Sequence, residues 1–283
     1  MWFGVSKLYV VATPIGNLKD VSARALETLK QVDLIAAEDT RHTKRLLAHF
    51  GIEQQLVSLH DHNEERQSQL LVQRILAGET VALVSDAGTP LISDPGYRLV
   101  RDARAAGLRV EPVPGASALT AALSVSGLPT DQFLFMGFLP VKGRRQKISD
   151  VRHYSGTLIF YEAPHRVLSL LEALEEGLDP SRRAVVCREL TKLYEQVEPG
   201  SLSELRQQVE AATLPAKGEF VVLVQGADEQ PMQGEVSLDD CLRVLMTELS
   251  ISKAAEMASA ILGLKRNVVY KRALAIRDEG SEL

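Results

Sequence analysis

The sequence predicts an α/β protein with two α/β domains, a ligand cleft between them, and a small C-terminal helical unit of helix-turn-helix type. Two observations predict this class. Short apolar runs alternate with stretches of helical period over most of the 283 residues, which is the pattern of βαβ units around a mostly parallel sheet. An acidic segment without periodicity then precedes a C-terminal stretch rich in lysine and arginine.

The first domain is expected over residues 1–116. Its strands are expected at residues 8–12, 34–37, 56–59, 81–84 and 109–113, and its helices at residues 22–32, 43–50, 64–77 and 97–106. The first and fourth of these strands lack polar alternation, as strands do when helices cover both faces of a sheet. The turn Asp94-Pro95-Gly96 is expected to cap the helix that follows it.

A cluster of proline and glycine at residues 112–117 breaks the rhythm and predicts a domain boundary. The second α/β domain is expected over residues 117–226, an acidic linker over 227–240 and a C-terminal helical unit over 241–283. Strands are expected at residues 133–139, 157–161, 184–187 and 220–224, and helices at residues 118–126, 165–176, 202–212, 253–262 and 267–276. In the C-terminal unit Ser252 is expected to cap the first helix and Gly263 to end it.

The composition of the chain is that of a globular protein without membrane-spanning segments. Hydrophobic residues make up 45% and charged residues 24% of the chain, as in ordinary globular proteins. No apolar run reaches the roughly 18 residues of a membrane span, and the first residues do not resemble a signal peptide. The two cysteines form no CxxC pair. We therefore expect a cytoplasmic protein that has no membrane partner and keeps its cysteines reduced.

Three polar loops follow strand ends, at residues 12–18, 37–41 and 85–90. The carboxyl ends of strands in an open α/β sheet line one crevice, so these loops are expected to meet there. The chain has no GxGxxG after its first strand and no GxxxxGK[ST], which argues against a dinucleotide or a P-loop phosphate site. The pair His60 and His62 lacks a third strong ligand, so no metal is expected.

Seven motifs together resemble the tetrapyrrole-methylase superfamily, and within it the branch that methylates small-subunit ribosomal RNA. They are Thr13-Pro14-Ile15-Gly16-Asn17-Leu18, Ala37-Glu38-Asp39-Thr40-Arg41, Ser85-Asp86-Ala87-Gly88-Thr89-Pro90, Pro114-Gly115-Ala116-Ser117, Tyr161-Glu162-Ala163-Pro164-His165-Arg166, Arg188-Glu189-Leu190-Thr191-Lys192 and Lys217-Gly218-Glu219-Phe220. The third loop lacks the Gly-Asp-Pro of the corrin branch, which favours the RNA branch.

The resemblance implies a homodimer that holds S-adenosylmethionine between its domains. It implies in-line methyl transfer to the 2′-hydroxyl of a cytidine in small-subunit rRNA, within an assembled or nearly assembled ribosomal subunit. The residues that it places against the donor are Pro14, Ile15, Gly16, Asn17, Asp86, Ala87, Gly88, Thr89, Pro90, Gly115, Ala116, Ser117, Glu162 and Ala163.

A ribose hydroxyl is a poor nucleophile, so a carboxylate or a neutral lysine beside it would help as a general base. The candidate catalytic residues are Glu38, Asp39, Asp86 and Lys192. Each also has a structural explanation. Glu38 and Asp39 could cap the helix around Thr43. Asp86 could anchor turn amides, and Lys192 could be a solvated surface side chain.

The candidate RNA contacts are the basic residues Arg41, Arg144, Arg145, Lys265, Arg266, Lys271 and Arg272. Six basic residues and one acid between Lys253 and Arg277 give this stretch a charge of +5, while the whole chain carries −5. Phosphates are natural partners for such a stretch. The alternatives are a docked helical hairpin with solvated charges, and an Arg41 that pairs with Glu38 or Asp39.

The sequence leaves two other functions open. The first is methylation of a small tetrapyrrole by the same fold and donor, although such a substrate gives no reason for the basic C-terminal stretch. The second is a nucleic-acid-binding regulator without catalytic activity, which would leave the three polar loops without a role.

Overall fold

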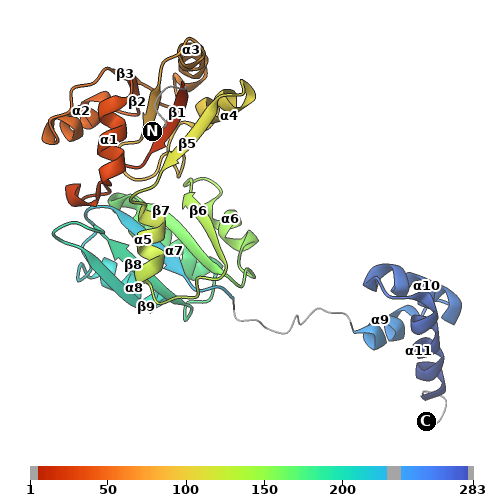
Figure 1. Ribbon diagram of the computed structural model, residues 1–283. Helices are drawn as coiled ribbons and strands as arrows, with labels where there is room; N and C mark the ends of the chain where they lie inside the picture. Colours follow the sequence, from red (N-terminus) through yellow and green to blue (C-terminus); the bar gives the residue numbers. More distant parts are fainter. Residues whose placement is uncertain (1–5, 228–236, 280–283) are drawn as a thin grey trace. The chain divides into compact units, whose positions relative to one another are not determined.

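The computed structural model describes residues 6–227 and 237–279, which belong to two separate compact units (Figure 1). The first unit contains two five-stranded sheets and the second contains three helices. This confirms the α/β class with an additional helical unit. Within the described ranges, no helix combines the length and the apolar character needed to cross a membrane.

The first sheet is entirely parallel, with the order β3-β2-β4-β1-β5. Its strands are β1 (Lys7–Val11), β2 (Leu34–Ala37), β3 (Leu56–Ser58), β4 (Val81–Val84) and β5 (Arg109–Val113). Every residue of β2 and β4 is buried. Central strands of this kind are covered on both faces, as their uninterrupted apolar sequences predict.

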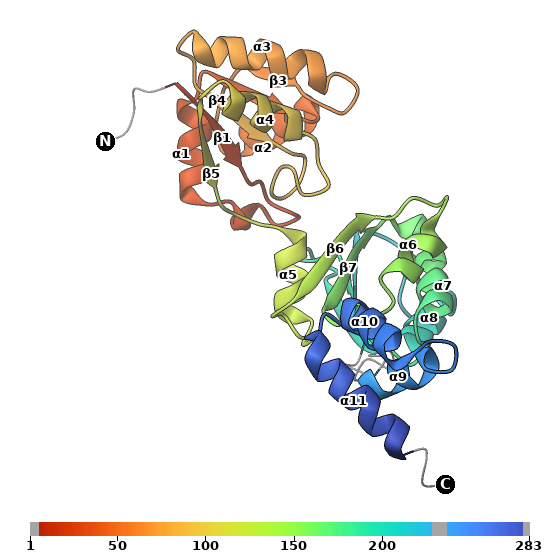
Figure 2. The same ribbon diagram turned by 90° about the vertical axis from the view of Figure 1, so that its right-hand side faces the viewer.

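Helices cover the two faces of this sheet in pairs (Figures 1 and 2). The helices are α1 (Ala23–Gln31), α2 (Thr40–His49), α3 (Glu64–Leu76) and α4 (Tyr97–Ala105), and a short 3₁₀ helix (Leu18–Asp20) precedes α1. Leu29 of α1 and Leu47 of α2 pack in one core cluster. Leu71 of α3 and Leu99 of α4 pack in the cluster on the opposite face.

The second sheet is mixed, with the order β6-β7-β10-β8-β9, and β6 and β7 form its one parallel pair. Its strands are β6 (Phe133–Phe138), β7 (Thr157–Glu162), β8 (Arg183–Arg188), β9 (Gln196–Ser201) and β10 (Phe220–Val224). The register between β6 and β7 shifts between Phe135 and Gly137. Such a bulge bends the strand and turns its end in a new direction.

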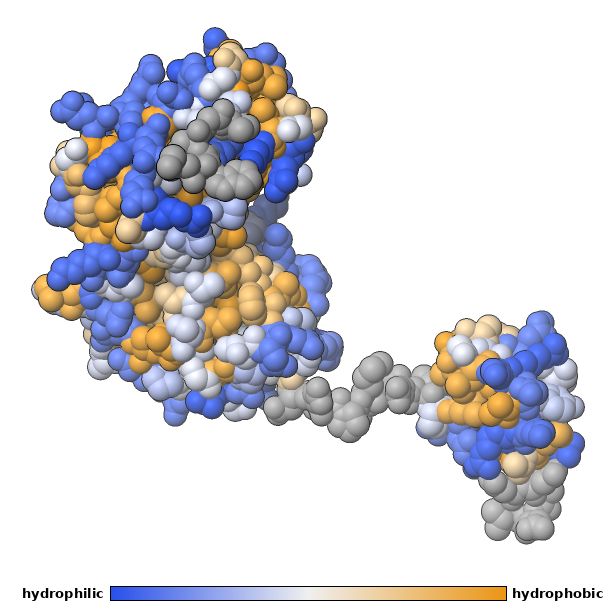
Figure 3. Space-filling view, in the orientation of Figure 1, coloured by the Kyte–Doolittle hydropathy of each residue, from blue (hydrophilic) through white to orange (hydrophobic). Residues whose placement is uncertain are grey.

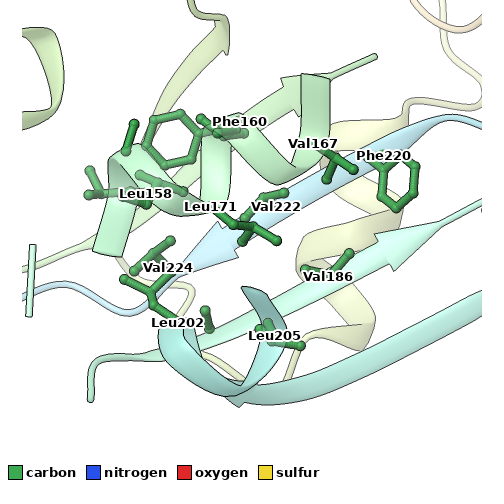
Figure 4. Close-up of a cluster of buried hydrophobic side chains, with 14 of the residues drawn as sticks. Leu158, Phe160, Val167, Leu171, Val186, Leu202, Leu205, Phe220, Val222 and Val224 are labelled. Carbon is green, nitrogen blue, oxygen red and sulfur yellow. The ribbon is translucent and has the colours of Figure 1, made fainter. Parts of the chain in front are cut away.

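Helices also pack on both faces of the second sheet. They are α5 (Ala118–Val125), α6 (Arg144–Asp150), α7 (Val167–Gly177) and α8 (Leu202–Glu210), and a 3₁₀ helix (Pro164–Arg166) precedes α7. Figure 4 shows the core formed with α7 and α8, where Leu171 lies beside Val222 and Leu205 lies near Val186. The opposite face packs against Ala122 of α5.

The C-terminal unit has its own apolar core. Its helices are α9 (Leu238–Leu245), α10 (Ile251–Leu262) and α11 (Arg266–Glu279). Leu242, Ala255, Val269 and Ala273 are fully buried against one another. As predicted, Gly263 ends α10, with a left-handed φ of 65° that glycine adopts without strain.

Several elements differ from the prediction. Helix α6, strand β9 and a separate helix α9 were not expected, and the first residues of α9 lie in the predicted linker 227–240. Residues 228–236 of that linker lie outside the described residues. Helix α10 begins after Ser250 rather than at a cap on Ser252.

Candidate active site

The loops after β1 and β4 are joined by backbone hydrogen bonds. The N–H of Thr13 donates to the carbonyl of Gly88 at 2.9 Å, and the N–H of Gly88 donates to the carbonyl of Thr13 at 3.1 Å. The Thr13 hydroxyl also donates to the carbonyl of Ser85 at 3.2 Å. Two loops about 70 residues apart in sequence therefore form one structural element at the carboxyl edge of the sheet.

The loop after β5 joins the same group. The Thr89 hydroxyl donates to the carbonyl of Ala116 at 3.0 Å. Gly88 has a φ of 88°, and a Cβ there would lie 3.2 Å from Cγ2 of Ile15. Both the positive φ and the close contact favour glycine at this position. Pro90 is buried nearby, whereas Ala87 and Gly115 are exposed.

The loop after β1 also reaches the second sheet. The Ile15 side chain is buried with Ala122, Ile159 and Val185 in the core of the second domain. Pro14 is buried beside it, and Asn17 accepts a hydrogen bond from the backbone N–H of Lys19. The predicted donor contact of Ile15 is therefore limited to its backbone, because its side chain anchors the loop.

Two acidic side chains link the loops after β2 and β4 reciprocally. The backbone N–H of Asp39 donates to Oδ1 of Asp86 at 3.0 Å. The backbone N–H of Asp86 donates to Oε2 of Glu38 at 3.4 Å. Each carboxylate thus holds the backbone of the other loop, and the carboxylates of Glu38 and Asp86 are kept close together.

The electrostatic environment of these loops is strongly acidic. Burial, together with the charges of Asp86, Asp61 and Asp39, raises the pKa of Glu38. Burial also raises the pKa of Asp94 to about 6, with further contributions from Glu38, Asp86 and Asp61. Because like charges close together disfavour further ionisation, this group of acids is suited to a positively charged ligand.

Asp94 belongs to this acidic group. The turn Asp94-Pro95-Gly96 begins α4 as predicted, with Gly96 as the N-cap, but the Asp94 carboxylate does not accept the N–H groups of the helix. The backbone N–H groups at the start of α4, those of Gly96 and Arg98, both donate to Oε1 of Glu64 at 2.9 Å. Asp94 is instead hydrogen-bonded to the side chain of Ser85. An Asp-Pro-Gly sequence resembles a local cap, and the sequence contains no sign that a distant glutamate takes its place.

The segment that carries Asp94 has a strained backbone. Leu91 and Ser93 have positive φ values of 74° and 68°. Conformations of this kind cost of the order of 1–3 kcal/mol each and concentrate at functional sites. A Cβ on Gly137, in the bulge of β6, would lie 3.0 Å from Oγ of Ser93. The segment therefore contacts the second sheet as well.

Tyr161, the first residue of its motif, also lies at the site, although no site role was predicted for it. Its hydroxyl is hydrogen-bonded to Ser117 and Leu119, and burial raises its pKa to about 12, with a contribution from the charge of Asp94. Its ring lies edge-on to Phe135 and Phe138, with centroids 4.9 and 5.5 Å apart. Phe138 is 53% exposed, so an aromatic surface is available beside the loops for stacking on a ligand.

Lys192 lies directly against the loop after β1. A Cβ on Gly16 would lie 2.4 Å from Cγ of Lys192. The ammonium donates to Glu189 at 2.8 Å and to Glu219 at 3.1 Å. Although burial opposes the charge, these carboxylates raise the pKa of Lys192. It remains a cation at neutral pH, so the expectation of a neutral lysine base is not met.

Asp39 caps α2 and pairs with Arg41, as in the structural alternatives that the sequence left open for these two residues. The Asp39 carboxylate accepts the backbone N–H of Arg41 at 2.8 Å as the cap of α2, and it also pairs with the Arg41 guanidinium at 2.8 Å. Hydrogen bonds from Arg41 hold the pKa of Asp39 well below its usual range. A carboxylate of such low basicity is a weak proton acceptor.

Arg144 does not contribute to an exposed basic patch, contrary to the expectation. It is 5% exposed, and its guanidinium lies 2.6 Å from the fully buried carboxylate of Glu162. Arg166 approaches the same carboxylate at 3.2 Å. A buried carboxylate requires such counter-charges. The Glu162 carboxylate also accepts the backbone N–H of Ala163 at 2.9 Å, so this side chain is fully engaged and is not available to a ligand.

The remaining predicted RNA contacts are mostly on the surface. Arg145 is exposed and pairs with Glu176 at 2.9 Å. In the C-terminal unit Lys265, Arg266 and Lys271 are exposed. Arg272 is partly buried and pairs with Asp239, which joins α11 to α9. Within the described parts of the chain, no three His, Cys, Asp or Glu side chains are placed to hold a metal ion.

The comparisons with known proteins agree with this architecture. Residues 7–206 match the tetrapyrrole (corrin/porphyrin) methylase family, and residues 233–277 match the RsmI C-terminal HTH domain. The ribosomal RNA small subunit methyltransferase I of Pseudomonas aeruginosa is 51% identical over 273 residues, with 94% of this chain and 96% of that protein covered. The protein of the same name from Escherichia coli O157:H7 is 49% identical over 270 residues, with 95% and 94% covered.

A solved structure shares the fold of the first unit. The uroporphyrin-III C-methyl transferase of Thermus thermophilus, complexed with S-adenyl homocysteine, has a TM-score of 0.54 and 19% identity, and the match covers 77% of this chain and 97% of that one. The chain therefore belongs to the tetrapyrrole methylase family, in the branch of the ribosomal RNA small subunit methyltransferases I.

Proposed function

We propose that this protein transfers a methyl group from S-adenosylmethionine to the 2′-hydroxyl of a cytidine in small-subunit ribosomal RNA. The observation that carries the proposal is the joining of Glu38, Asp86 and Asp94 at the carboxyl edge of the first sheet. The relatives that match nearly the whole chain bear the name of ribosomal RNA methyltransferases, and this supports RNA as the substrate.

The site suits a sulfonium donor chemically. S-adenosylmethionine carries a positive charge on sulfur and supplies an electrophilic methyl group when it is bound. The acidic group around Glu38 and Asp94 provides a negative potential for that charge. The S-adenyl homocysteine in the Thermus enzyme is the product left when this donor has given up its methyl group. Backbone groups of residues 14–17, 86–90, 115–117 and 162–163 would hold the donor.

Glu38 is the group that we assign as general base. Burial raises its pKa, and a more basic carboxylate accepts a hydroxyl proton more readily. The ribose oxygen forms its new bond to carbon as the carbon–sulfur bond breaks, with the electron pair going to sulfur and the proton to Glu38. Positioning can supply about 7–11 kcal/mol of such a barrier, and base catalysis adds a factor of about 10²–10⁴.

The other side chains then have separate roles. Asp86 is a positioning residue, because it holds the backbone beside Glu38. Lys192 keeps the loop after β1 in place as a paired cation. The exposed lysines and arginine of the C-terminal unit bind phosphates of the RNA. Action as a homodimer on the assembled subunit in the cytoplasm is part of the same proposal.

The test is methyl transfer from labelled S-adenosylmethionine to small ribosomal subunits isolated from cells that lack the protein, followed by nucleoside analysis. Labelled 2′-O-methylcytidine is the expected product. A labelled base, or a different nucleoside, would overturn the proposed acceptor. If the protein binds the donor but transfers nothing to subunits or to naked rRNA, while it methylates a tetrapyrrole, RNA is not the substrate. The variant Glu38→Gln serves as the control for base catalysis.

A further inference from the structure

Helix α2 carries a basic surface. Arg41 is the one residue of it that was predicted from the sequence to contact RNA. We define the α2 surface as the exposed side chains of Arg41, Lys44, Arg45 and His49. We infer that the α2 surface binds the phosphates of the RNA strand that continues from the methylated nucleotide. This inference rests on the proposed function, because it names the path of the substrate beyond the acceptor site.

The positive charge of α2 is concentrated and one-sided. The ten residues of the helix include three cations and no acid, in a chain with a net charge of −5. Arg41, Arg45 and His49 are spaced by four residues, so they follow one face, and Lys44 lies beside them. Thr43 and Leu47 are buried on the other side. Figure 3 shows hydrophilic and hydrophobic side chains side by side in this part of the first domain.

Helix stability does not account for this arrangement. The N-terminal end of a helix dipole is positive, so cations in the first turns are unfavourable and acids are favoured there. Helix α2 has no acid in its first turn, and Asp39 at the cap pairs with Arg41 alone. Within the described parts of the chain, neither Lys44 nor Arg45 forms an ion pair. Their charge is therefore available to a ligand.

A groove runs along the same helix. It has a volume of about 830 Å³ and lies between α2 and residues 51–56. Its lining includes the cations Arg41 and Lys44, one acid, Glu53, and apolar residues among which are Ile52 and Leu56. Cations next to an apolar wall suit a nucleotide, whose phosphate is charged and whose base has apolar faces.

The α2 surface begins at the proposed active site. Its helix is capped by Asp39, whose backbone N–H donates to Asp86. Four residues of helix advance about 6 Å along the axis, so the cations form a row that leads away from Glu38 and Asp86. A strand whose ribose reaches Glu38 would thus bring its neighbouring phosphates along this row. Continuity with the acceptor site favours RNA over a protein partner.

The experiment compares two double variants of the full chain. Lys44→Gln/Arg45→Gln removes two charges from the α2 surface while it keeps long side chains that favour helix. Arg66→Gln/Arg104→Gln removes two exposed charges from α3 and α4, on the opposite face of the sheet. Binding of naked small-subunit rRNA is measured over a range of potassium chloride concentrations, and donor affinity is measured in parallel.

We expect Lys44→Gln/Arg45→Gln to weaken rRNA binding several-fold and to reduce the slope of log K against log salt by about 1–2, since each phosphate contact contributes slightly less than one. Donor affinity should be unchanged, and the control variant should bind like the wild type. Equal slopes for the two variants would overturn the inference. So would a loss that appears only with assembled subunits, because the partner would then be a ribosomal protein.

The two proposals fail in different ways. Suppose that the wild type methylates rRNA and that both variants show the wild-type slope of log K against log salt. The α2 surface then does not bind the RNA, and the proposed function stands. If only the α2 variant has a reduced salt slope and the wild type transfers no methyl group to small subunits or to naked rRNA, the surface binds RNA and the proposed reaction is wrong. A loss of donor affinity in the α2 variant would show that these residues support the site structurally, which also overturns the inference.

Discussion

The backbone N–H of Asp39 and the carboxylate of Asp86 are joined by a hydrogen bond of 3.0 Å. This bond connects the loops that follow two neighbouring strands, β2 and β4. It also places the capping residue of α2 against the acid of the third motif loop. Rearrangement of either loop would therefore move the acidic group, and with it the proposed base Glu38.

The first prediction concerns Asp86→Asn. The amide keeps an oxygen that can accept the Asp39 hydrogen bond, but it removes the negative charge beside Glu38. We expect methyl transfer to fall about 10²-fold, while the thermal unfolding temperature changes by only a few degrees. Single-turnover rates and thermal unfolding measure the two effects. An unaltered rate would show that Asp86 does not contribute to methyl transfer.

The second prediction concerns pH and Asp94. Because the pKa of Asp94 in the folded state, about 6, lies above the ordinary value of 3.8 for an aspartate, the protonated carboxyl is favoured in the folded state. The stability that this provides is complete below about pH 4 and is lost as the pH rises through 6. We expect Asp94→Asn to be more stable than wild type by about 1 kcal/mol at pH 8, after allowance for partial exposure, and equally stable at pH 3.5.

Urea unfolding at the two pH values tests this expectation. Asp131→Asn is a suitable control, because Asp131 is an exposed acid away from the loops. A gain in stability that is equal at both pH values would show that the ionisation of Asp94 is not its cause.

The third prediction concerns the buried carboxylate of Glu162. Glu162→Gln leaves the guanidinium of Arg144 buried without its counter-charge. Breaking a buried pair in this way costs about 3 kcal/mol. The matched control is Glu176→Gln, which breaks an exposed pair with Arg145 and should cost less than about 1 kcal/mol. Denaturant unfolding of both variants measures the difference, and equal losses would contradict the assignment.

The fourth prediction concerns the C-terminal unit. A chain that ends at Ala227 keeps both sheets and their cores. We expect donor affinity to be retained and rRNA affinity to fall, with a decrease of about 3 in the salt slope from the loss of Lys265, Arg266 and Lys271. Calorimetry with the donor and titration with rRNA at several salt concentrations test this. Loss of donor binding would mean that the unit supports the site.

The sequence predicted the strongly patterned parts of the fold well. Strands β1 and β4 are short apolar runs between helical patterns, and both lie in the middle of the first sheet. Strand β9 was missed because it contains Pro199 and Gly200, which are rare in strand interiors and suit an edge. Helix α6 was missed because its seven residues are too few to show a helical period.

In the candidate site too, local sequence patterns were predicted, whereas contacts between residues far apart in the sequence were not. The motif loops were found from sequence because each follows a strand and contains an acid or a glycine. The role of Asp94 could not be read locally, because the true cap of α4 comes from Glu64. Arg144 appeared to be a surface cation among other basic residues, but its partner Glu162 lies 18 positions away. Tertiary contacts of this kind leave no local pattern.

The separate core of the C-terminal unit has a consequence for how the enzyme searches for its substrate. Leu242, Ala255 and Val269 are buried within that unit, so it does not depend on the sheets for its packing. When one of two binding modules on a chain is attached, the encounter of the second becomes intramolecular and its effective concentration rises. A basic unit held on rRNA would thus keep the catalytic loops at high local concentration near the nucleotides around it.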